Sequence, residues 1–260
     1  MKTQEKNFDG IKLSGFTAIL IMLALTGTAI YLLSLPQTPS IIAGVICGIC
    51  VVVMLPGFMI IQPNNSRVLT FFGRYAGTVI SNGFYWVNPL FLKSTVTLRI
   101  LNLNIDPIKV NDKVGNPIMI GAVVVWRIKD TYKASFDISG NIREFVQIQS
   151  DAALRQVAGM YAYDTNETID KVTLRSDESG EITQRLEDEL NSRLAIAGIE
   201  IVEARINYLA YASEIASVML RRQQADAIIS ARERIVEGAV SMVHLALEKL
   251  EKDGVVELYE

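Results

Sequence analysis

Two long apolar stretches dominate the first quarter of the chain. The first runs from Gly15 to Leu35 and the second from Ile41 to Ile61, and neither contains a charged residue. About twenty apolar residues suffice for a helix to span a bilayer. A signal peptide is the alternative for the first stretch, but the run is too long and lacks a small-residue cleavage site. The pattern therefore predicts two transmembrane helices joined by the turn Pro36–Ser40, with a kink at Pro56.

Basic residues on both flanks predict the orientation of this hairpin. Lys2, Lys6 and Lys12 precede the first span, Arg67 and Arg74 follow the second, and the connecting turn has none. Positively charged flanks stay in the cytoplasm. We therefore expect a multi-pass protein of the plasma (inner) membrane whose N- and C-termini are both cytoplasmic.

Two glycines and two cysteines inside the second stretch form closely spaced pairs. Gly44 and Gly48 form a GxxxG pair, which lets two helix backbones approach closely, although such a spacing can also arise by chance in a segment rich in small residues. Cys47 and Cys50 form a CxxC, but a redox pair needs thiolates and access to water. We treat the glycines as candidates for transmembrane packing and the cysteines as small packing residues.

Short apolar runs separated by glycines follow the membrane exit. They cover Arg67–Phe72, Gly77–Ile80 and Phe84–Val87 and predict an antiparallel meander. Apolar and polar residues then alternate from Thr95 to Ile105. The frame changes by one residue at 100/101, which predicts a bulge or a strand that moves between sheets.

An aromatic group lies within this β-rich part, close in sequence to the second span. Phe84, Trp86 and Phe91 flank Pro89. Because aromatic rings are favoured at the membrane–water interface, these three residues are candidates for contact with the cytoplasmic membrane surface. The alternative is an ordinary strand that feeds the protein core.

The periodicity after residue 111 changes from strand to helix and back. Apolar and polar residues alternate strictly in one segment, which is the clearest strand pattern in the chain. Apolar residues at every fourth position from Ile182 to Leu194 predict an amphipathic helix. The predicted elements are the hairpin loop Asp112–Pro117, the strand Ile118–Ile128, the helix Asn141–Tyr161, a second helix that Asp177 can cap and Gly198 ends, and the strand Ile199–Tyr208. This order predicts an α+β body in two lobes.

A long C-terminal helix completes the chain, with Ser213 as its predicted N-cap and Asp253–Gly254 at its end. Its seam advances by alternating steps of three and four residues from Ile215 to Leu250, a heptad rhythm that favours coiled-coil association. Small residues in the seam predict close packing between helices. The seam positions that we expect to mediate assembly are Ala225, Ile229, Val236, Ala239, Val243 and Ala246.

These elements predict four parts of the chain. Residues 1–61 form an N-terminal tail and the two transmembrane helices, and residues 62–100 a membrane-proximal β-rich lobe. Residues 101–211 form a second α+β lobe, and residues 212–260 the assembly helix and a tail.

The composition excludes several kinds of chemistry. The 260 residues carry a formal net charge of −3 and no basic stripe, so nucleic acid is not an expected partner. Two cysteines and the single His244 exclude a disulfide framework and a histidine-based zinc site. His244 lies in the last helix, where Glu248 is an ordinary helix neighbour. A Ser–Lys dyad needs no histidine, but no serine has a recognisable nucleophile context. We expect neither an enzyme nor a bound cofactor or metal.

Six segments, by their order and spacing, resemble one known family. They are Val68–Tyr75, Asn82–Leu90, Thr97–Arg99, Val124–Asp130, Ala152–Val157 and Glu214–Ile215. Together they resemble the stomatin/prohibitin/flotillin superfamily, whose shared domain is called SPFH or Band 7, over roughly residues 60–250. With its hairpin the chain is similar to bacterial members that have two transmembrane helices. Asn82 and Tyr85 stand where proline and histidine are common in relatives, and the alanine-rich helix is shorter here.

The resemblance implies a non-catalytic membrane scaffold. Family members assemble into large membrane-attached rings or cages in which neighbouring helices form a wall around a patch of bilayer. Some bacterial members restrain or gate a membrane-anchored AAA-type protease, and others organise lipid microdomains. The expected partners are therefore membrane lipids and further copies of the chain. Two functions stay open: a homo-oligomeric scaffold that organises a patch of membrane, and a stoichiometric regulator of such a protease.

Overall fold

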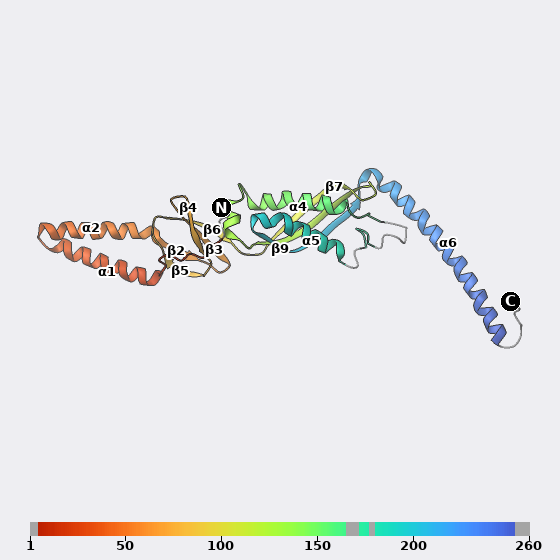
Figure 1. Cartoon of the computed structure of the whole chain (residues 1–260), viewed down its shortest axis with the longest axis horizontal. Helices are drawn as coiled ribbons and strands as arrows, with labels where there is room; N and C mark the ends of the chain where they lie inside the picture. Colours follow the sequence, from red (N-terminus) through yellow and green to blue (C-terminus); the bar gives the residue numbers. More distant parts are fainter. Residues whose placement is uncertain (1–4, 165–171, 177–179, 253–260) are drawn as a thin grey trace. The chain divides into compact units, whose positions relative to one another are not determined.

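The computed structural model of the chain describes residues 5–164, 172–176 and 180–252 (Figure 1). Its elements are β1 (Leu13–Ser14), α1 (Gly15–Ser34), α2 (Thr38–Met54), a 3-10 turn (Leu55–Gly57), β2 (Phe58–Ile61), β3 (Asn65–Phe71), β4 (Arg74–Val79), β5 (Gly83–Trp86), β6 (Phe91–Thr97), β7 (Leu101–Asn111), β8 (Pro117–Ile128), α3 (Thr131–Phe136), α4 (Ile142–Ala158), α5 (Glu181–Leu194), a second 3-10 turn (Ala195–Ala197), β9 (Ile199–Tyr211) and α6 (Ser213–Lys252). The predicted α+β class, with an N-terminal helical hairpin and a long C-terminal helix, is confirmed.

The chain divides into two compact units. One contains Met1–Ile105, Ala122–Leu154 and Thr183–Ile206, and the other contains Asp106–Gly121, Arg155–Ile182 and Asn207–Glu260. The helical hairpin and the β-rich lobe belong to the first unit, and α6 belongs to the second.

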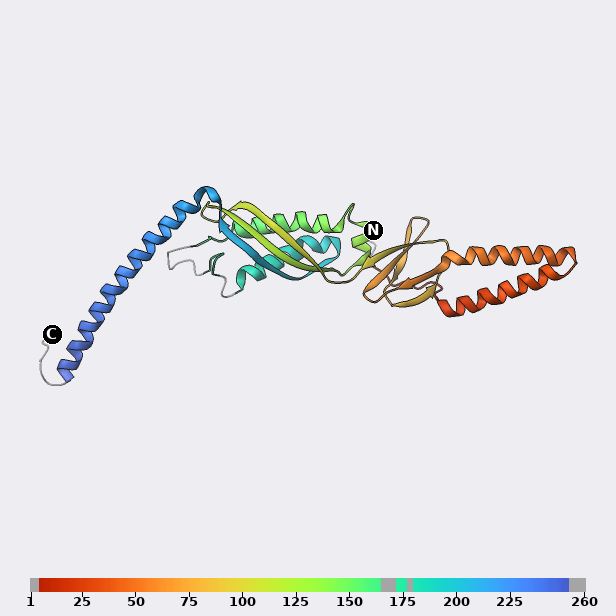
Figure 2. The same cartoon turned by 180° about the vertical axis from the view of Figure 1, so that it is seen from behind.

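Helices α1 and α2 pack side by side as a hairpin (Figures 1 and 2). Among the described residues two helical segments are long and apolar enough to cross a membrane: α1 (Gly15–Ser34), and α2 together with the 3-10 turn that follows it (Thr38–Gly57). The prediction that the second helix continues to Ile61 is wrong. Pro56 has no N–H to donate and crowds the preceding turn, so α2 ends at Met54 and Phe58–Ile61 forms β2 instead.

The predicted antiparallel meander of the first lobe is confirmed for β3 and β4, which pair antiparallel, and is wrong for β5. The strands pair in the orders β1-β5-β2 and β4-β3-β6, so β5 leaves its sequence neighbour β4 and pairs with β2. The reason is a shared core, to which β2 and β5 as well as β3 and β4 contribute. Its buried residues are Met59, Ile61, Leu69, Val79 and Val87. A single flat meander could not enclose these side chains.

The N-terminal tail is an integral part of this lobe. Leu13 pairs with Trp86 of β5. The Phe8 N–H donates to the Thr78 carbonyl at 3.0 Å, and the Thr78 N–H donates to the Lys6 carbonyl at 2.9 Å. The tail therefore adds backbone hydrogen bonds to both β4 and β5.

The strands after residue 100 form a sheet of order β7-β8-β9. β6 ends at Thr97 in one sheet and β7 begins at Leu101 in another, which confirms a strand that moves between sheets. Loop 112–116 joins β7 to β8 as predicted. The alternation in β8 is confirmed, because its even-numbered side chains from Ile118 to Trp126 are at most 2% exposed.

Helices α4 and α5 are drawn alongside this sheet in both views (Figures 1 and 2). The four predicted apolar positions of α5 are at most 1% exposed: Ile182, Leu186, Leu190 and Leu194. In α4, Ile148 is exposed. Short helix α3 was not predicted, and the Asp177 cap lies outside the described residues.

Helix α6 runs over 40 residues from Ser213 to Lys252. Its first hydrogen bonds run from the Ile215 and Ala216 N–H groups to the Ala212 carbonyl. Ala212 therefore holds the cap position, and the prediction of Ser213 as N-cap is wrong by one residue. The predicted end at Asp253–Gly254 lies outside the described residues.

Candidate functional site

His244 and the two cysteines lie on different helices. The part of the chain that the structure describes contains no group of three or more His, Cys, Asp and Glu residues that could hold a metal ion. His244 is an exposed side chain on α6, with its Nδ1 3.9 Å from Glu248. Cys47 and Cys50 are free thiols in α2. The sites that remain are surfaces and contacts between elements.

Phe84 and Trp86 lie where the two apolar helices meet the β-rich lobe. The Phe84 ring stacks on Phe58 with centroids 5.5 Å apart, and it meets Phe16 of α1 edge-on at 5.6 Å. The Trp86 indole N–H donates to the carbonyl of Met54, the last residue of α2, at 2.9 Å. Both predicted interface residues therefore fix the ends of α1 and α2 to β5.

The third predicted interface residue, Phe91, lies in a different environment. Its ring meets Phe8 and Phe71 edge-on, with centroids 5.4 Å apart in each case. Phe91 packs against the core of the β-rich lobe. The structure thus groups Phe84 with Trp86 at the helix ends and separates Phe91 from them. Contact of these residues with a membrane surface stays a prediction.

A cavity of about 440 Å³ lies beside the end of α2, and we call it the α2-end cavity. Its lining residues are Pro56, Phe58, Met59, Ile60, Arg67, Phe84 and Lys93. The Lys93 ammonium donates hydrogen bonds to the carbonyl oxygens of Pro56, in the 3-10 turn after α2, and of Phe58, in β2, so it joins β6 to the segment that follows α2. Burial, and then the positive charge of Arg67, lowers the pKa of Lys93.

The β3–β6 pairing brings the two cations of this cavity together. Leu69 is opposite Lys93 and Arg67 is opposite Thr95, which makes Arg67 and Lys93 diagonal neighbours on one face. Sequence reasoning used Arg67 only as a flanking charge and missed Lys93. No local pattern relates two positions 26 residues apart, because strand register alone sets their distance.

The two candidate packing glycines of α2 differ in their surroundings. Gly44 is buried, and a Cβ at this position would lie 2.8 Å from Leu33 and 3.1 Å from the Ala29 carbonyl oxygen. A Cβ on Gly48 would meet nothing within 4 Å. Within one chain, therefore, only Gly44 of this pair lies at the α1–α2 contact.

The apolar seam of α6 is exposed in the single chain. Ile229, Val236 and Val243 are 54%, 62% and 60% exposed, and Ala225, Ala239 and Ala246 are exposed as well. Further exposed apolar residues widen this side of the helix: Ile228, Ile235, Val240, Met242 and Leu247. We call this set the α6 apolar face. The described residues of the same chain leave it uncovered.

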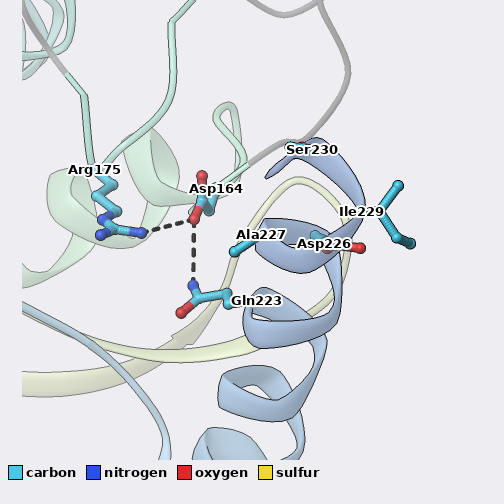
Figure 3. Close-up of a pocket in the computed structure, with 7 residues that line it drawn as sticks. All are labelled: Asp164, Arg175, Gln223, Asp226, Ala227, Ile229 and Ser230. Carbon is cyan, nitrogen blue, oxygen red and sulfur yellow. Dashed lines mark hydrogen bonds and ion pairs between the residues drawn. The ribbon is translucent and has the colours of Figure 1, made fainter. Parts of the chain in front are cut away.

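A polar pocket of about 540 Å³ lies beside the first half of α6 (Figure 3). The Asp164 carboxylate accepts hydrogen bonds from Arg175 at 3.0 Å and from Gln223 of α6 at 3.3 Å. Burial, and then the negative charge of Asp164, raises the pKa of Tyr211. Sequence reasoning missed this contact, which joins the loop that follows α4 to the early turns of α6.

Comparison with known proteins adds one finding to this geometry. The sequence profile of the SPFH domain / Band 7 family matches residues 59–240. The match begins within β2, directly after the helical hairpin, and ends within α6. A search of curated proteins found no match to the chain.

Proposed function

The chain belongs to the SPFH domain / Band 7 family, and from this premise we propose that it is a membrane-anchored scaffold whose copies assemble side by side through α6. Proteins of this family are generally non-catalytic scaffolds. The proposed product is a large ring or cage that organises a patch of membrane. The observation that carries the proposal is the exposed α6 apolar face.

The α6 apolar face has the spacing that an association surface needs. Ile229, Val236, Val243 and Leu250 recur at seven-residue intervals, so they form one line along the helix. Burial of apolar area contributes about 25 cal/mol per Å², and an uncovered patch of this kind marks an interaction site. A second copy of α6 carries the same face at the same spacing and can cover it.

The small residues of the seam determine how close that second helix can come. Ala225, Ala239 and Ala246 form a second line at seven- or fourteen-residue intervals beside the first. A methyl side chain leaves room for a neighbouring helix, as at close helix contacts in general. This supports side-by-side packing of α6 helices.

The strand pairing around the hairpin supports an anchor with both ends on one side of the membrane. β1 directly precedes α1 and β2 follows α2, and both strands pair with β5. A hairpin that leaves and re-enters the same small sheet must cross the bilayer and return. With basic residues on both flanks, this supports a cytoplasmic location for the body and for the N-terminal tail.

Particle size tests the proposal, with one variant in the seam and one outside it. The full chain, extracted in mild detergent, should elute as a particle of many copies. Overpacking a tight contact costs about 1–3 kcal/mol, and this cost recurs at every interface, so Ala239→Leu should reduce the particle size. Glu233→Leu, an exposed position outside the seam, should do much less.

Each contrary outcome has a definite meaning. If Ala239→Leu particles keep the native size, the α6 seam is not the assembly contact. If the unmodified chain is a monomer in mild detergent and after cross-linking in the membrane, the scaffold proposal is wrong.

Stoichiometric regulation of a membrane-anchored AAA-type protease is the alternative function. It requires a second protein in a fixed ratio to the chain. Affinity purification from native membranes distinguishes the two roles: a protease at constant stoichiometry would favour the regulator, and the chain with its lipids alone would favour the scaffold.

A further inference from the structure

The α2-end cavity contains two positive charges that are not balanced within it. Arg67 and Lys93 both line the cavity, and none of the described residues that line it is acidic. Diagonal neighbours on a β-sheet are typically about 7–8 Å apart, close enough for the charge of Arg67 to lower the pKa of Lys93. An anion placed between the two side chains would remove this repulsion.

Both side chains retain hydrogen-bond donors for such an anion. A lysine ammonium has three N–H donors, and Lys93 directs hydrogen bonds to the carbonyls of Pro56 and Phe58. The guanidinium of Arg67 makes no hydrogen bond or ion pair with any side chain or backbone group that the structure describes. Arginine donates bidentately to phosphate, and lysine adds a point charge.

The place of the cavity in the chain determines which anion reaches it. Pro56 and Phe58 follow α2 directly, and the rings of Phe58 and Phe84 are stacked at the foot of the hairpin. If α2 spans the bilayer, as the proposed function requires, these residues lie at the level of the lipid headgroups. Aromatic rings are favoured at that level, and the cavity has the volume of a small-molecule site.

We propose that the α2-end cavity binds the phosphodiester group of an anionic phospholipid between Arg67 and Lys93. The glycerol and upper acyl chains would contact the apolar wall formed by Phe58, Ile60 and Phe84. A phosphatidylcholine headgroup also contains a phosphodiester, but its quaternary ammonium is repelled by the two cations. The site therefore selects headgroups of net negative charge. This inference rests on the proposed function only in that the hairpin must cross a membrane.

Arg67 is the residue to change, because Lys93 also joins β6 to the segment that follows α2. Arg67→Gln removes one cation from the cavity and leaves the hydrogen bonds of Lys93 in place. Arg74→Gln is the matched control, since Arg74 is an exposed arginine on the neighbouring strand β4 and does not line the cavity. Arg67→Lys keeps the charge but loses the bidentate geometry, so it should bind more tightly than Arg67→Gln and less tightly than the unmodified chain.

Native mass spectrometry of the full chain in non-ionic detergent measures the binding directly. The probes are dihexanoylphosphatidylglycerol, dihexanoylphosphatidylcholine and inorganic phosphate, each titrated separately. We expect the phosphatidylglycerol probe to bind more tightly than the other two. Loss of one charge-assisted contact should weaken it about tenfold in Arg67→Gln and leave it unchanged in Arg74→Gln.

The contrary outcomes overturn the inference without affecting the proposed function. Equal phosphatidylglycerol affinity in Arg67→Gln and Arg74→Gln would exclude the cavity as the site. Binding of inorganic phosphate as tight as that of the lipid would show an anion site with no lipid specificity. Membrane insertion is measured separately by alkaline carbonate extraction. If the unmodified chain is extracted, the proposed anchor is wrong, whereas failure of lipid binding in an inserted chain refutes the lipid site alone.

Discussion

Gly198 joins α5 to β9 with a backbone that a side chain would disturb. Its φ is 67°, and a Cβ there would lie 2.5 Å from the Asp130 carbonyl oxygen. Its own carbonyl accepts hydrogen bonds from the N–H groups of Lys129 and Asp130 at 2.8 and 3.0 Å. The residue therefore connects the turn after α5 to the end of β8.

We predict that Gly198→Ala lowers the free energy of unfolding by about 1–3 kcal/mol, because it adds backbone strain and a steric clash. Thermal unfolding in detergent measures the loss. Gly159→Ala is the control, since a Cβ at Gly159 would meet its nearest neighbours at an ordinary 3.6 Å. Equal stability of the two variants would contradict the prediction.

Glu200 gives a pH-dependent contribution to stability. Hydrogen bonds from Lys129 and then Arg127 hold the pKa of Glu200 below its ordinary value of 4.5. A carboxyl whose folded pKa is lowered stabilises the fold above its unfolded pKa, and this contribution is lost as the pH falls through the folded pKa. The Glu200 side chain is partly exposed, so the contribution is modest.

Glu200→Gln should therefore cost about 0.2–1 kcal/mol at neutral pH. The difference in unfolding temperature from the unmodified chain should shrink as the pH falls below 4.5, where protonation removes the charge from the unmodified residue too. A difference that stays constant down to the acid limit of folding would mean that the ion pairs contribute nothing.

At the scale of the element, the contact between α1 and α2 involves Gly44 of the GxxxG pair but not Gly48. We predict that Gly44→Leu destabilises the hairpin by about 1–3 kcal/mol, because the larger side chain overpacks its contact with α1. Gly48→Leu should have little effect on the stability of the single chain. Unfolding in detergent measures both variants.

Particle size provides a second measurement on the same two variants. If Gly48→Leu leaves the unfolding temperature unchanged but reduces particle size, Gly48 packs against a hairpin of another copy. If Gly44→Leu is as stable as the unmodified chain, the close approach of Gly44 to Ala29 is not required for the hairpin.

For the whole molecule, the orientation of the hairpin determines on which side of the membrane the body of the protein lies. We predict that a cysteine at Thr38 reacts with a membrane-impermeant maleimide added to intact cells, whereas cysteines at Lys6 and Gln62 react only after lysis. All three side chains are exposed. Ser66, also close to the membrane exit, is fully buried and would not report orientation. Cys47 and Cys50 are replaced by alanine in this experiment, and the reverse labelling pattern would refute the orientation.

Elements with a long, regular period could be predicted because the periodicity itself is local. α1, β8 and α6 each continue one pattern over ten residues or more, so each further residue supports the same type of secondary structure. The four apolar positions of α5 and the left-handed Gly198 follow in the same way from spacing and from one residue type.

Contacts between distant positions depend on the fold. Phe58–Ile61 is apolar enough for lipid or for a sheet, and it forms a strand because Pro56 ends α2 and β5 offers unpaired hydrogen-bond groups. The N-terminal tail lacks the alternation of apolar and polar residues that is typical of a strand. Its position is determined by backbone groups of Thr78 and Trp86, which are available to pair with it. Arg67 becomes a neighbour of Lys93 through the register of β3 and β6. Asp164 becomes a neighbour of Gln223 because α6 returns to the loop that follows α4. The pattern of apolar and polar residues in a segment indicates which of its faces can be buried. The segment against which that face packs is determined by the tertiary structure, because other segments bury their own apolar faces at the same place.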